Sequence, residues 1–376
     1  MKRGKAPPPT MGRKQTPQRE VVTVSSPLTA LRRISTGSIV LDTALKGGIP
    51  LGTVTVISGR ADTGKTLLCS HIVANAVKAG MKALILDLEG RFLDPERLLN
   101  RGLTPEEIEK NVKVISSIFT VEDAARIIRG ELTTNPPNVI VIDSIASLQS
   151  FSSFSSVQSE DVKGGIGETA RAFTREFRDI LYGQVQKTQT ALILTTQKRT
   201  TILPYGAYES DYLPNILRHA PATYIQLKTE EEEKGKDSPF KAEKVKEMTR
   251  PLFKTIIFSF EKNQYGFPHA RGVTRYFLFS QPEYGINIGD WDLVYEVCGL
   301  GSVSFFRVVR PVNEDGRKAY ISPSGTKYYV TELYTKPEVR HRFLSEAVEP
   351  FVQKMIQFWS GGFVSINDAQ LSDEEG

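Results

Sequence analysis

The chain has 376 residues, of which 40% are hydrophobic and 24% are charged, and its formal net charge is +5. This composition is ordinary for a globular protein, and the length is enough for one large domain with smaller appendages. No apolar run approaches the roughly 20 residues that span a bilayer, and the N-terminus lacks the apolar core of a secretory signal. Membrane-spanning proteins are therefore excluded, and we expect an intracellular protein.

The positive charge is concentrated in residues 1–20, which hold six basic side chains and one acidic side chain. This segment alone accounts for the net charge of +5, so the rest of the chain is formally neutral. Three consecutive prolines from Pro7 to Pro9 and a scarcity of large apolar residues predict that it forms no packed core. A basic arm beside a neutral body is typical of a nucleic-acid-binding or targeting segment. A solvated terminus without a specific role is an equally good interpretation.

From Arg33 onward, apolar strand-like runs alternate with helical patterns. The predicted elements are strands at 53–58, 82–88, 138–143 and 190–195, and helices at 65–78, 121–129 and 169–181. In the first of these helices, apolar side chains recur at helical spacing from Leu67 to Val77. Continuous apolar strands separated by helices predict a mostly parallel sheet that is covered on both faces. The ligand site of such a sheet lies at the C-terminal ends of its strands.

The pattern changes after residue 229. Residues 230–250 are highly charged, which predicts a mobile excursion at the surface. Residues 254–260 and 274–279 have the character of two further strands of the same sheet. Beyond residue 289 we expect a small α+β appendage, which ends in an amphipathic helix near 337–358 and an acidic tip.

A phosphate-loop pattern lies between the first predicted strand and the first predicted helix. The glycines of such a loop let backbone N–H groups curl around phosphates, and the following helix adds its positive N-terminal end. Lys65 would reach the β- and γ-phosphates, and the Thr66 hydroxyl would bind magnesium. The expected nucleotide-binding residues of the loop are Gly59, Arg60, Ala61, Asp62, Thr63, Gly64, Lys65 and Thr66.

Polar residues at the ends of three other predicted strands are candidates for catalysis. Asp143 ends an apolar strand and would hold magnesium through water. Glu89 follows the strand 82–88 and is the best candidate for activating the attacking water, with Asp87 as its competitor. Gln197, at the end of the strand 190–195, would contact the γ-phosphate. For Glu89 and Gln197 the alternative is a polar cap at a strand end.

Two segments that follow strand ends have the composition of single-stranded DNA-binding loops, because they combine positive charge with aromatic side chains. They span 149–167 and 198–218, which is long for connections inside a compact domain. The candidate DNA-binding residues are Phe151, Phe154, Lys163, Gly164 and Gly165 in the first segment, and Lys198, Arg199, Tyr205, Tyr208 and Arg218 in the second. Plain surface loops are the alternative interpretation of the composition.

These motifs, in this order and at these distances, resemble the RecA family of recombinases from about Ile34 to Asn287. The matching segments are ISTGS at 34–38, LDLE at 86–89, VIVIDS at 139–144, KN at 262–263 and YGIN at 284–287. The resemblance implies an α/β fold with a RecA-like P-loop NTPase core and a mostly parallel central sheet. It also implies ATP and Mg²⁺ as ligands. The short arm and charged appendage resemble phage-encoded members such as UvsX, although a bacterial source fits equally well.

The resemblance also implies roles for particular residues. It gives the catalytic carboxylate to Glu89 and γ-phosphate sensing to Gln197, and it places the family's two DNA-binding loops at the two segments described above. Lys262 matches a lysine that reaches ATP across the subunit interface. Asp94 and Arg97 fall in the region that contacts the nucleotide.

The sequence departs from the family pattern in several places. Gln264 occupies the position of a second interface lysine, and Arg97 stands where an aromatic ring usually stacks on adenine. One extra residue lies between Glu89 and Pro95. The second DNA segment lacks the family's paired glycines, and residues 230–250 have the character of an insertion.

We therefore expect an ATP-dependent DNA recombinase, that is, a DNA-dependent ATPase that coats single-stranded DNA as a homo-oligomeric filament and exchanges strands with double-stranded DNA. Expected partners include single-strand-binding and loader proteins. We expect the protein to act in the cytoplasm at the nucleoid, or in the host cytoplasm if a phage encodes it. The alternatives are a hexameric helicase of the same fold and a recombination mediator or regulator. The expected domains are a basic arm with a polymerisation segment (1–32), the ATPase core (33–288) and a small C-terminal domain (289–376).

Overall fold

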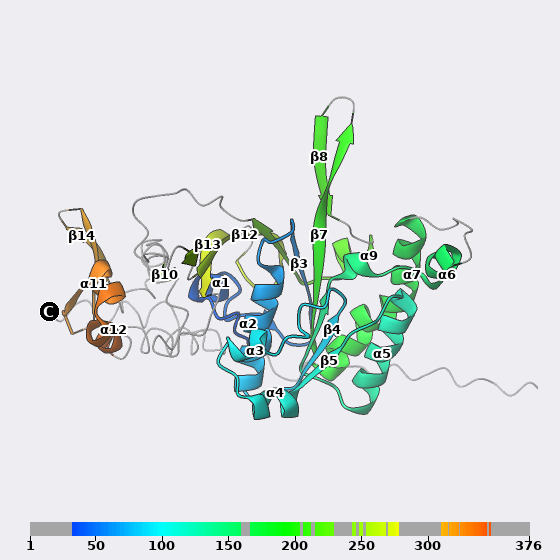
Figure 1. The fold of residues 1–376 in the computed structure, drawn as a ribbon, viewed down its shortest axis with the longest axis horizontal. Helices are drawn as coiled ribbons and strands as arrows, with labels where there is room; N and C mark the ends of the chain where they lie inside the picture. Colours follow the sequence, from blue (N-terminus) through cyan, green and yellow to red (C-terminus); the bar gives the residue numbers. More distant parts are fainter. Residues whose placement is uncertain are drawn as a thin grey trace, which may run out of the picture.

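The computed structural model describes residues 32–158, 166–203, 206–211, 215–228, 243–245, 248–250, 253–267, 270–277, 310–314, 316–322, 324–343 and 346 (Figure 1). None of the helices in these ranges combines the length and the apolar character that a membrane crossing requires. The N-terminal arm and Tyr212 to Pro214 are among the residues outside these ranges.

A nine-stranded sheet forms the centre of the molecule, with β8 paired only to β7 and the other strands in the order β13-β12-β9-β3-β7-β6-β4-β5. Its strands are β3 (Val54–Gly59), β4 (Ala83–Asp87), β5 (Val112–Ile115), β6 (Val139–Asp143), β7 (Ala191–Leu203), β8 (Gly206–Asp211), β9 (Thr223–Lys228), β12 (Phe253–Asn263) and β13 (Arg271–Phe277). The strands from β9 to β5 in this order pair in parallel, whereas β12 and β13 are antiparallel. The prediction of a mostly parallel sheet is confirmed.

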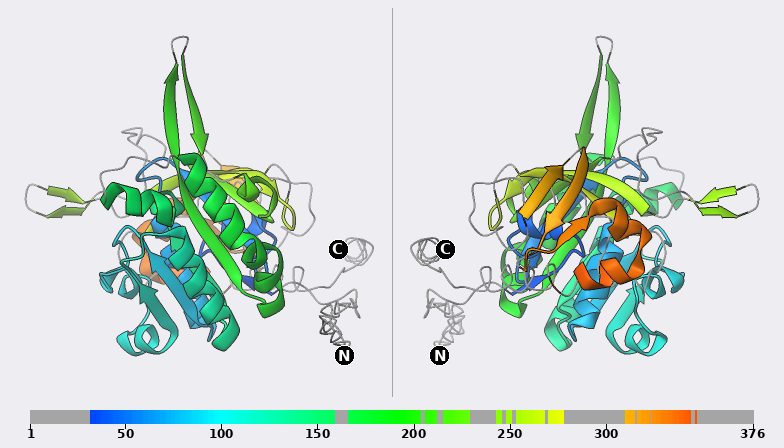
Figure 2. Two further views of the ribbon diagram at one scale, coloured as in Figure 1. Left: turned by 90° about the vertical axis from the view of Figure 1, so that its right-hand side faces the viewer. Right: turned by 90° about the vertical axis from the view of Figure 1, so that its left-hand side faces the viewer.

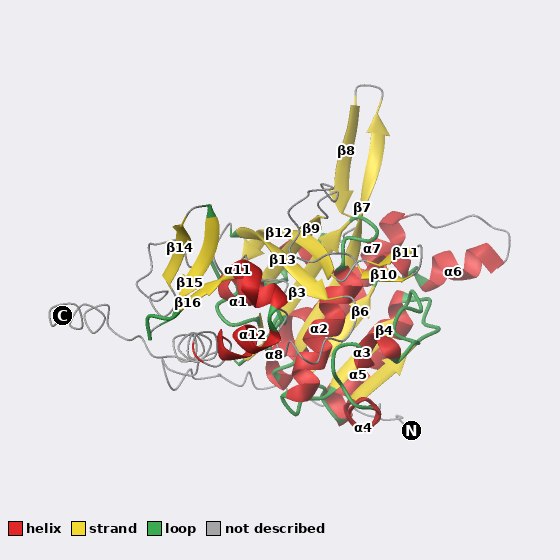
Figure 3. Cartoon of the chain, turned by 60° about the vertical axis from the view of Figure 1, so that its left-hand side comes forward, coloured by secondary structure: helices red, strands yellow, loops and turns green. Residues whose placement is uncertain are grey.

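Helices cover both faces of the sheet (Figures 2 and 3). They are α2 (Lys65–Lys78), α3 (Glu96–Leu99) and α4 (Pro105–Asn111) on one face, and α5 (Val121–Thr134) and α7 (Ile166–Asp179) on the other. Alternation along β6 serves both layers: Val139 and Val141 pack in the core on the α2 side, while Ile140 and Ile142 pack on the α5 side. The continuous apolar strands are therefore explained by burial on both faces.

The helix limits follow local capping. Helix α2 occupies the predicted residues, whereas α5 continues five residues beyond the predicted end at 129. Its start is fixed by Thr120, whose side chain accepts a hydrogen bond from the Asp123 N–H at 3.1 Å. Helix α7 continues through a π-helical turn, Ile180–Gln184, into α8 (Val185–Thr188).

The prediction of irregular loops over the two DNA segments is wrong for most of their described residues. The first segment contains α6 (Phe151–Gln158), because Ser150 caps this helix by accepting the Ser153 N–H at 3.2 Å. In the second segment, β7 continues to Leu203 and pairs with β8 as an antiparallel ribbon that projects from the sheet (Figure 1). The β-branched run from Thr200 to Ile202 favours this extended backbone. Arg218 lies on a short helix, α9 (Ile216–His219).

The charged segment 230–250 also contains regular structure, since β10 (Glu243–Val245) and β11 (Met248–Arg250) form an antiparallel pair. Near the C-terminus, β14 (Arg310–Glu314), β15 (Arg317–Ile321) and β16 (Lys327–Tyr329) form a separate antiparallel sheet. It is followed by α11 (Val330–Thr335) and α12 (Pro337–Phe343), which matches the predicted α+β composition. The predicted domain boundary at 288–289 and residues 347–358 of the predicted helix lie outside the described residues.

A buried carboxylate organises the turn before the sheet, which comprises β1 (Arg33–Ile34), α1 (Ile39–Ala44) and β2 (Ile49–Pro50). Asp42 accepts hydrogen bonds from the Ser35 hydroxyl at 2.6 Å and from the Thr36 N–H and hydroxyl at 2.8 and 2.7 Å. Burial raises the pKa of Asp42 to about 6, because the loss of solvent outweighs these three hydrogen bonds.

Asp42 therefore predicts a pH-dependent contribution to stability. Its folded pKa of about 6 lies above the ordinary value of 3.8, so its stabilisation is complete below pH 3.8 and is lost as the pH rises through 6. Relative to Asp42→Asn, the wild type should lose on the order of 3 kcal/mol of unfolding free energy between pH 4 and pH 7. Urea unfolding of both proteins at several pH values measures this difference. A difference that does not change with pH would contradict the assignment.

Candidate functional site

The ends of three parallel strands and the adjoining part of β7 bring the predicted catalytic residues together. Gly59, at the end of β3, is level with Gln197 on β7, and Asp87, at the end of β4, is level with Asp143 on β6. Glu89 lies two residues beyond β4, where the Leu88 N–H still donates to the Asp143 carbonyl at 2.9 Å. Side chains far apart in the sequence therefore share one edge of the sheet, as expected for a ligand site in an α/β protein.

The phosphate loop connects β3 to α2, and its two glycines are required by packing. A Cβ atom on Gly59 would lie 2.4 Å from the Thr63 hydroxyl and 2.8 Å from the Leu227 carbonyl. Gly64 has a φ of 93°, and its Cβ would lie 2.4 Å from Cδ1 of Ile256. Only glycine fits both positions without displacing a neighbour.

The outer part of the loop is accessible, because Arg60, Ala61 and Asp62 are exposed. The Thr63 side chain is turned inward and donates to the Arg60 carbonyl at 3.0 Å. The loop is therefore folded into a cradle that is open to a ligand on its outer side.

Lys65 lies inside this cradle. Its Nζ atom donates to the Gly59 carbonyl at 3.0 Å and to the Arg60 carbonyl at 2.7 Å. Burial lowers the pKa of Lys65, and the carboxylates of Asp143 and Glu89 oppose this shift. The ammonium group and the N-terminal end of α2 form the kind of donor set that binds phosphate.

Asp143 is held by two hydroxyl groups. Thr66 donates to one carboxylate oxygen at 2.6 Å, and Thr195 on β7 donates to the other at 2.5 Å. Burial raises the pKa of Asp143, while both hydrogen bonds act in the opposite direction. The next side chain, Ser144, is buried and its hydroxyl has no hydrogen-bond partner within the described part of the chain. Carboxylate and hydroxyl oxygens are hard ligands that suit Mg²⁺.

Glu89 and Gln197 contact each other directly. The Gln197 amide donates to Oε1 of Glu89 at 3.0 Å, and Arg91 pairs with Oε2 at 2.9 Å. Asp87, the competing carboxylate, is buried and accepts the backbone N–H groups of Arg91 and Phe92 at 3.0 and 2.7 Å. Asp87 therefore shapes the turn after β4, and the geometry favours Glu89 as the carboxylate that is available for chemistry.

Three residues that were expected at the nucleotide have other contacts in this structure. Asp94 accepts the N–H of Glu96, the first residue of α3, at 2.9 Å. Arg97 donates to the Arg91 carbonyl at 2.6 Å and lies over the Phe92 ring. Lys262 donates to the His219 carbonyl at 2.9 Å.

Lys262 lies near the end of β12 that is remote from the phosphate loop of its own chain. It is level with Tyr224 on β9, which is in turn level with Val56 in the middle of β3. The strand therefore does not bring Lys262 to this loop, and its role across a subunit interface stays a prediction. The neighbouring Gln264 donates its N–H to the Ala222 carbonyl at 2.9 Å.

The predicted DNA-binding residues are only partly described. Phe151 is 60% exposed on α6, whereas Phe154 is half-buried and stacks on Phe119 with ring centroids 5.7 Å apart. Lys198 donates to the Gln226 side chain at 3.4 Å, and Arg218 is exposed on α9. The residues outside the described ranges are Lys163, Gly164, Gly165 and Tyr205, and for Arg199 and Tyr208 only the backbone is described.

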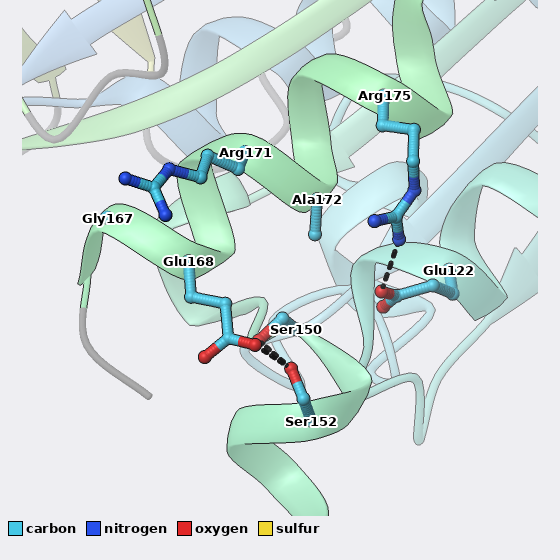
Figure 4. A pocket seen from close by; sticks show the side chains of 8 residues that line it. All are labelled: Glu122, Ser150, Ser152, Gly167, Glu168, Arg171, Ala172 and Arg175. Carbon is cyan, nitrogen blue, oxygen red and sulfur yellow. Dashed lines mark hydrogen bonds and ion pairs between the residues drawn. The ribbon is translucent and has the colours of Figure 1, made fainter. Parts of the chain in front are cut away.

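A cavity of about 550 Å³ opens beside the first DNA segment, between the start of α5, α6 and α7 (Figure 4). Glu122 and Arg175 form an ion pair in its lining at 3.3 Å, and the Ser152 hydroxyl donates to Glu168. The lining residues are Glu122, Ser150, Ser152, Gly167, Glu168, Arg171, Ala172 and Arg175. The cavity therefore combines both signs of charge.

Sequence reasoning missed Thr195, Arg91 and Phe119. Thr195 carried a usable signal, because it is a hydroxyl residue in a buried apolar strand two positions before Gln197. Arg91 and Phe119 carried none, since their partners depend on how the strand ends meet.

Comparison with known proteins agrees with the motifs. The model of the RecA N-terminal domain family matches residues 14–260. Protein RecA of Herpetosiphon aurantiacus is 31% identical over 255 residues, which cover 65% of this chain and 67% of the relative. Protein RecA of Zymomonas mobilis is 29% identical over 231 residues, or 60% and 62% of the two chains. Protein RecA of Aquifex aeolicus is 35% identical over 175 residues, or 45% and 46%. The chain thus spans about half to two thirds of these relatives.

Two buried threonines on adjacent strands offer a matched test of the Asp143 contact. Thr195→Val removes the hydroxyl that donates to a buried carboxylate and should lower the unfolding free energy by about 1–3 kcal/mol. Thr55→Val on β3 removes a buried hydroxyl that has no hydrogen-bond partner among the described residues, and it should be neutral or stabilising. Urea unfolding measures both variants. Equal losses of unfolding free energy in the two variants would show that the hydrogen bond from Thr195 to Asp143 does not stabilise the fold.

Proposed function

The chain belongs to the RecA family, and we propose that it is an ATP-dependent DNA recombinase that binds single-stranded DNA as a filament and promotes pairing and strand exchange. One observation carries the link between ATP and DNA. The Gln197 amide donates to Glu89 at 3.0 Å, and the strand that bears Gln197 continues directly into the ribbon of the second DNA segment. The strand thus supports the proposal by connecting the residues that we assign to the nucleotide with those that we assign to DNA.

The phosphate loop and its neighbours fit a magnesium nucleotide. Lys65 would bind the β- and γ-phosphates, while backbone N–H groups of the glycine-containing loop would bind the remaining phosphate oxygens. Thr66 and Asp143 would hold Mg²⁺, which neutralises charge on the phosphates when it is bound. The buried hydroxyl of Ser144 beside Asp143, which has no hydrogen-bond partner among the described residues, supports a polar ligand at this place.

We assign hydrolysis to Glu89. Its carboxylate would orient the attacking water and accept its proton, which is the usual role of a general base. Gln197 and Arg91 contact its two oxygens and thereby fix the direction of the group. Each carboxylate oxygen keeps a further lone pair for water.

Gln197 would couple the nucleotide to the DNA segment. A γ-phosphate that attracts the Gln197 amide competes for the same side chain that now holds Glu89. The resulting shift would pass along β7 to Lys198 and the ribbon, as in other switches that respond to a γ-phosphate. ATP would thus strengthen DNA binding, and hydrolysis would weaken it.

The DNA contacts that we propose combine aromatic and positive side chains. The exposed rings of Phe119 and Phe151 offer flat surfaces for bases, and Lys198 and Arg218 offer positive charge for the backbone. The filament would be homo-oligomeric, with Lys262 reaching the nucleotide of the neighbouring subunit. Duplex DNA, single-strand-binding proteins and loader proteins complete the proposed partners, with the cytoplasm as the site of action.

The function predicts ATP hydrolysis that single-stranded DNA stimulates. Lys65→Ala should abolish turnover because it removes the phosphate-binding amine. Glu89→Gln should keep ATP binding but lower kcat by roughly 10²–10⁴-fold, since the general base is lost. Steady-state phosphate release with and without DNA, together with equilibrium ATP binding, checks all three proteins.

Two outcomes, one in these assays and one in electron micrographs, would contradict a recombinase. ATP binding without any stimulation by DNA would indicate a mediator or regulator. Closed rings in electron micrographs, in place of open filaments, would indicate a helicase.

A second prediction concerns coupling. Gln197→Ala should bind DNA with the same affinity with and without ATP, because the side chain between the two sites is missing. Gln186→Ala, an exposed change on α8, should behave as the wild type. Fluorescence anisotropy of labelled single-stranded DNA measures the affinities. Full ATP enhancement in Gln197→Ala would exclude this route of coupling.

A further inference from the structure

Strand β12 extends beyond the edge of the sheet on the side of the phosphate loop. Gly59 at the end of β3 is level with Leu227 on β9, and Leu227 is level with Phe258 on β12. Because β12 runs antiparallel, its earlier residues continue past this level. Lys254 precedes Phe258 by four positions and therefore lies roughly 13 Å further along the strand. This places Lys254 beside the loop.

The alternation of β12 determines which face Lys254 occupies. Phe260, Phe258 and Ile256 all pack in the core on the α2 side. Lys254 is the next residue of the same face. This face of β12 carries apolar side chains where α2 covers it. At the level where α2 begins, near Lys65, the same face carries Lys254. An apolar residue would be exposed there.

The contacts of Lys254 are with the loop itself. Its Nζ atom donates to the Asp62 carbonyl, and its Cδ atom lies 3.9 Å from the position that a Cβ on Gly64 would take. Asp62 is exposed and belongs to the accessible outer part of the loop. The loop is thus held by Lys65 from the inside and by Lys254 from the rim.

The ammonium group of Lys254 has N–H donors that no described group accepts. An ammonium group has three N–H donors, and within the described residues only the Asp62 carbonyl accepts one of them. No carboxylate of the described residues forms an ion pair with it. A positive charge that is partly buried, unpaired and adjacent to a phosphate cradle favours a ligand with several negative oxygens.

We propose that Lys254 is a second nucleotide-binding lysine, which acts within its own subunit by holding the rim of the phosphate loop and donating to the polyphosphate of the bound nucleotide. The proposal rests on the function proposed above, namely that ATP binds this loop. It separates Lys254 from Lys262, which lies near the opposite end of the same strand. One strand then serves the nucleotide of its own subunit at its start and, in a filament, a neighbour's nucleotide near its end.

Three variants test the proposal. Lys254→Met keeps the length and packing of the side chain but removes its charge, whereas Lys254→Arg keeps the charge. Lys82→Met, at the opposite end of the sheet, is the control for net charge. Isothermal titration of the full chain with ATP and with ADP in the presence of Mg²⁺ gives the affinities, and thermal unfolding without nucleotide shows whether each variant is folded.

Lys254→Met should weaken binding of both nucleotides by roughly tenfold, as expected for a charge-assisted contact. This loss should shrink as salt is raised, because added ions screen the missing charge. Lys254→Arg should restore most of the affinity, and Lys82→Met should change it little. If Lys254 had only a structural role, Lys254→Met would instead lower the melting temperature, and its effect on nucleotide affinity would not depend on salt.

Affinities of Lys254→Met within twofold of the wild type would overturn the proposal while leaving ATP binding by the protein intact. Equal losses in Lys254→Met and Lys254→Arg, accompanied by a lower melting temperature, would also overturn it in favour of packing. A wild-type protein that binds neither nucleotide would overturn the proposed function itself, so the two failures are distinguishable.

Discussion

The candidate site depends on the register of parallel strands. Asp143 receives hydrogen bonds from Thr66 at the start of α2 and from Thr195 on β7, so the end of β6, the start of α2 and the middle of β7 must lie at matching heights. A slip of one residue in β6 or β7 would turn these side chains to the opposite face of the sheet. Burial of both faces prevents such a slip, because it would move apolar side chains out of two cores at once. The strand register that keeps both cores buried therefore also fixes the geometry of the site.

Two strands extend past the level at which the short parallel strands end. β7 has 13 residues and β12 has 11, whereas β3, β4 and β6 have five or six. The extra length of β7 joins Gln197 to the ribbon, and that of β12 brings Lys254 to the phosphate loop. The extension of β7 begins where its pairing with β3 ends, and that of β12 begins where β9 ends, while β13 continues beside it. Long strands thus place side chains that the short strands cannot reach.

Sequence patterns were sufficient for much of this arrangement. The spacing of the phosphate loop and the apolar strands located α2, the parallel sheet and the strand ends at which Glu89, Asp143 and Gln197 meet. The ribbon was not predicted, because a polar strand without cover has the composition of a loop. The serine-rich α6 was missed for a similar reason, since its start depends on the Ser150 cap. The contact of Lys254 with Asp62 could not be predicted from the sequence, because it depends on the register of β12 and not on the spacing of residues along the chain.

The ribbon formed by β7 and β8 has an energetic consequence. Beyond Gln197 the two strands pair only with each other among the residues that the structure describes, and two-stranded ribbons are marginally stable in water. In the proposed function, binding of DNA would offset much of the conformational entropy that is lost on ordering such a ribbon. Once one ligand has ordered the ribbon, a second ligand that needs the same ordered state binds with less loss of entropy. In the proposed function, cooperativity between nucleotide and DNA would therefore arise from the limited stability of the ribbon as well as from movement of Gln197.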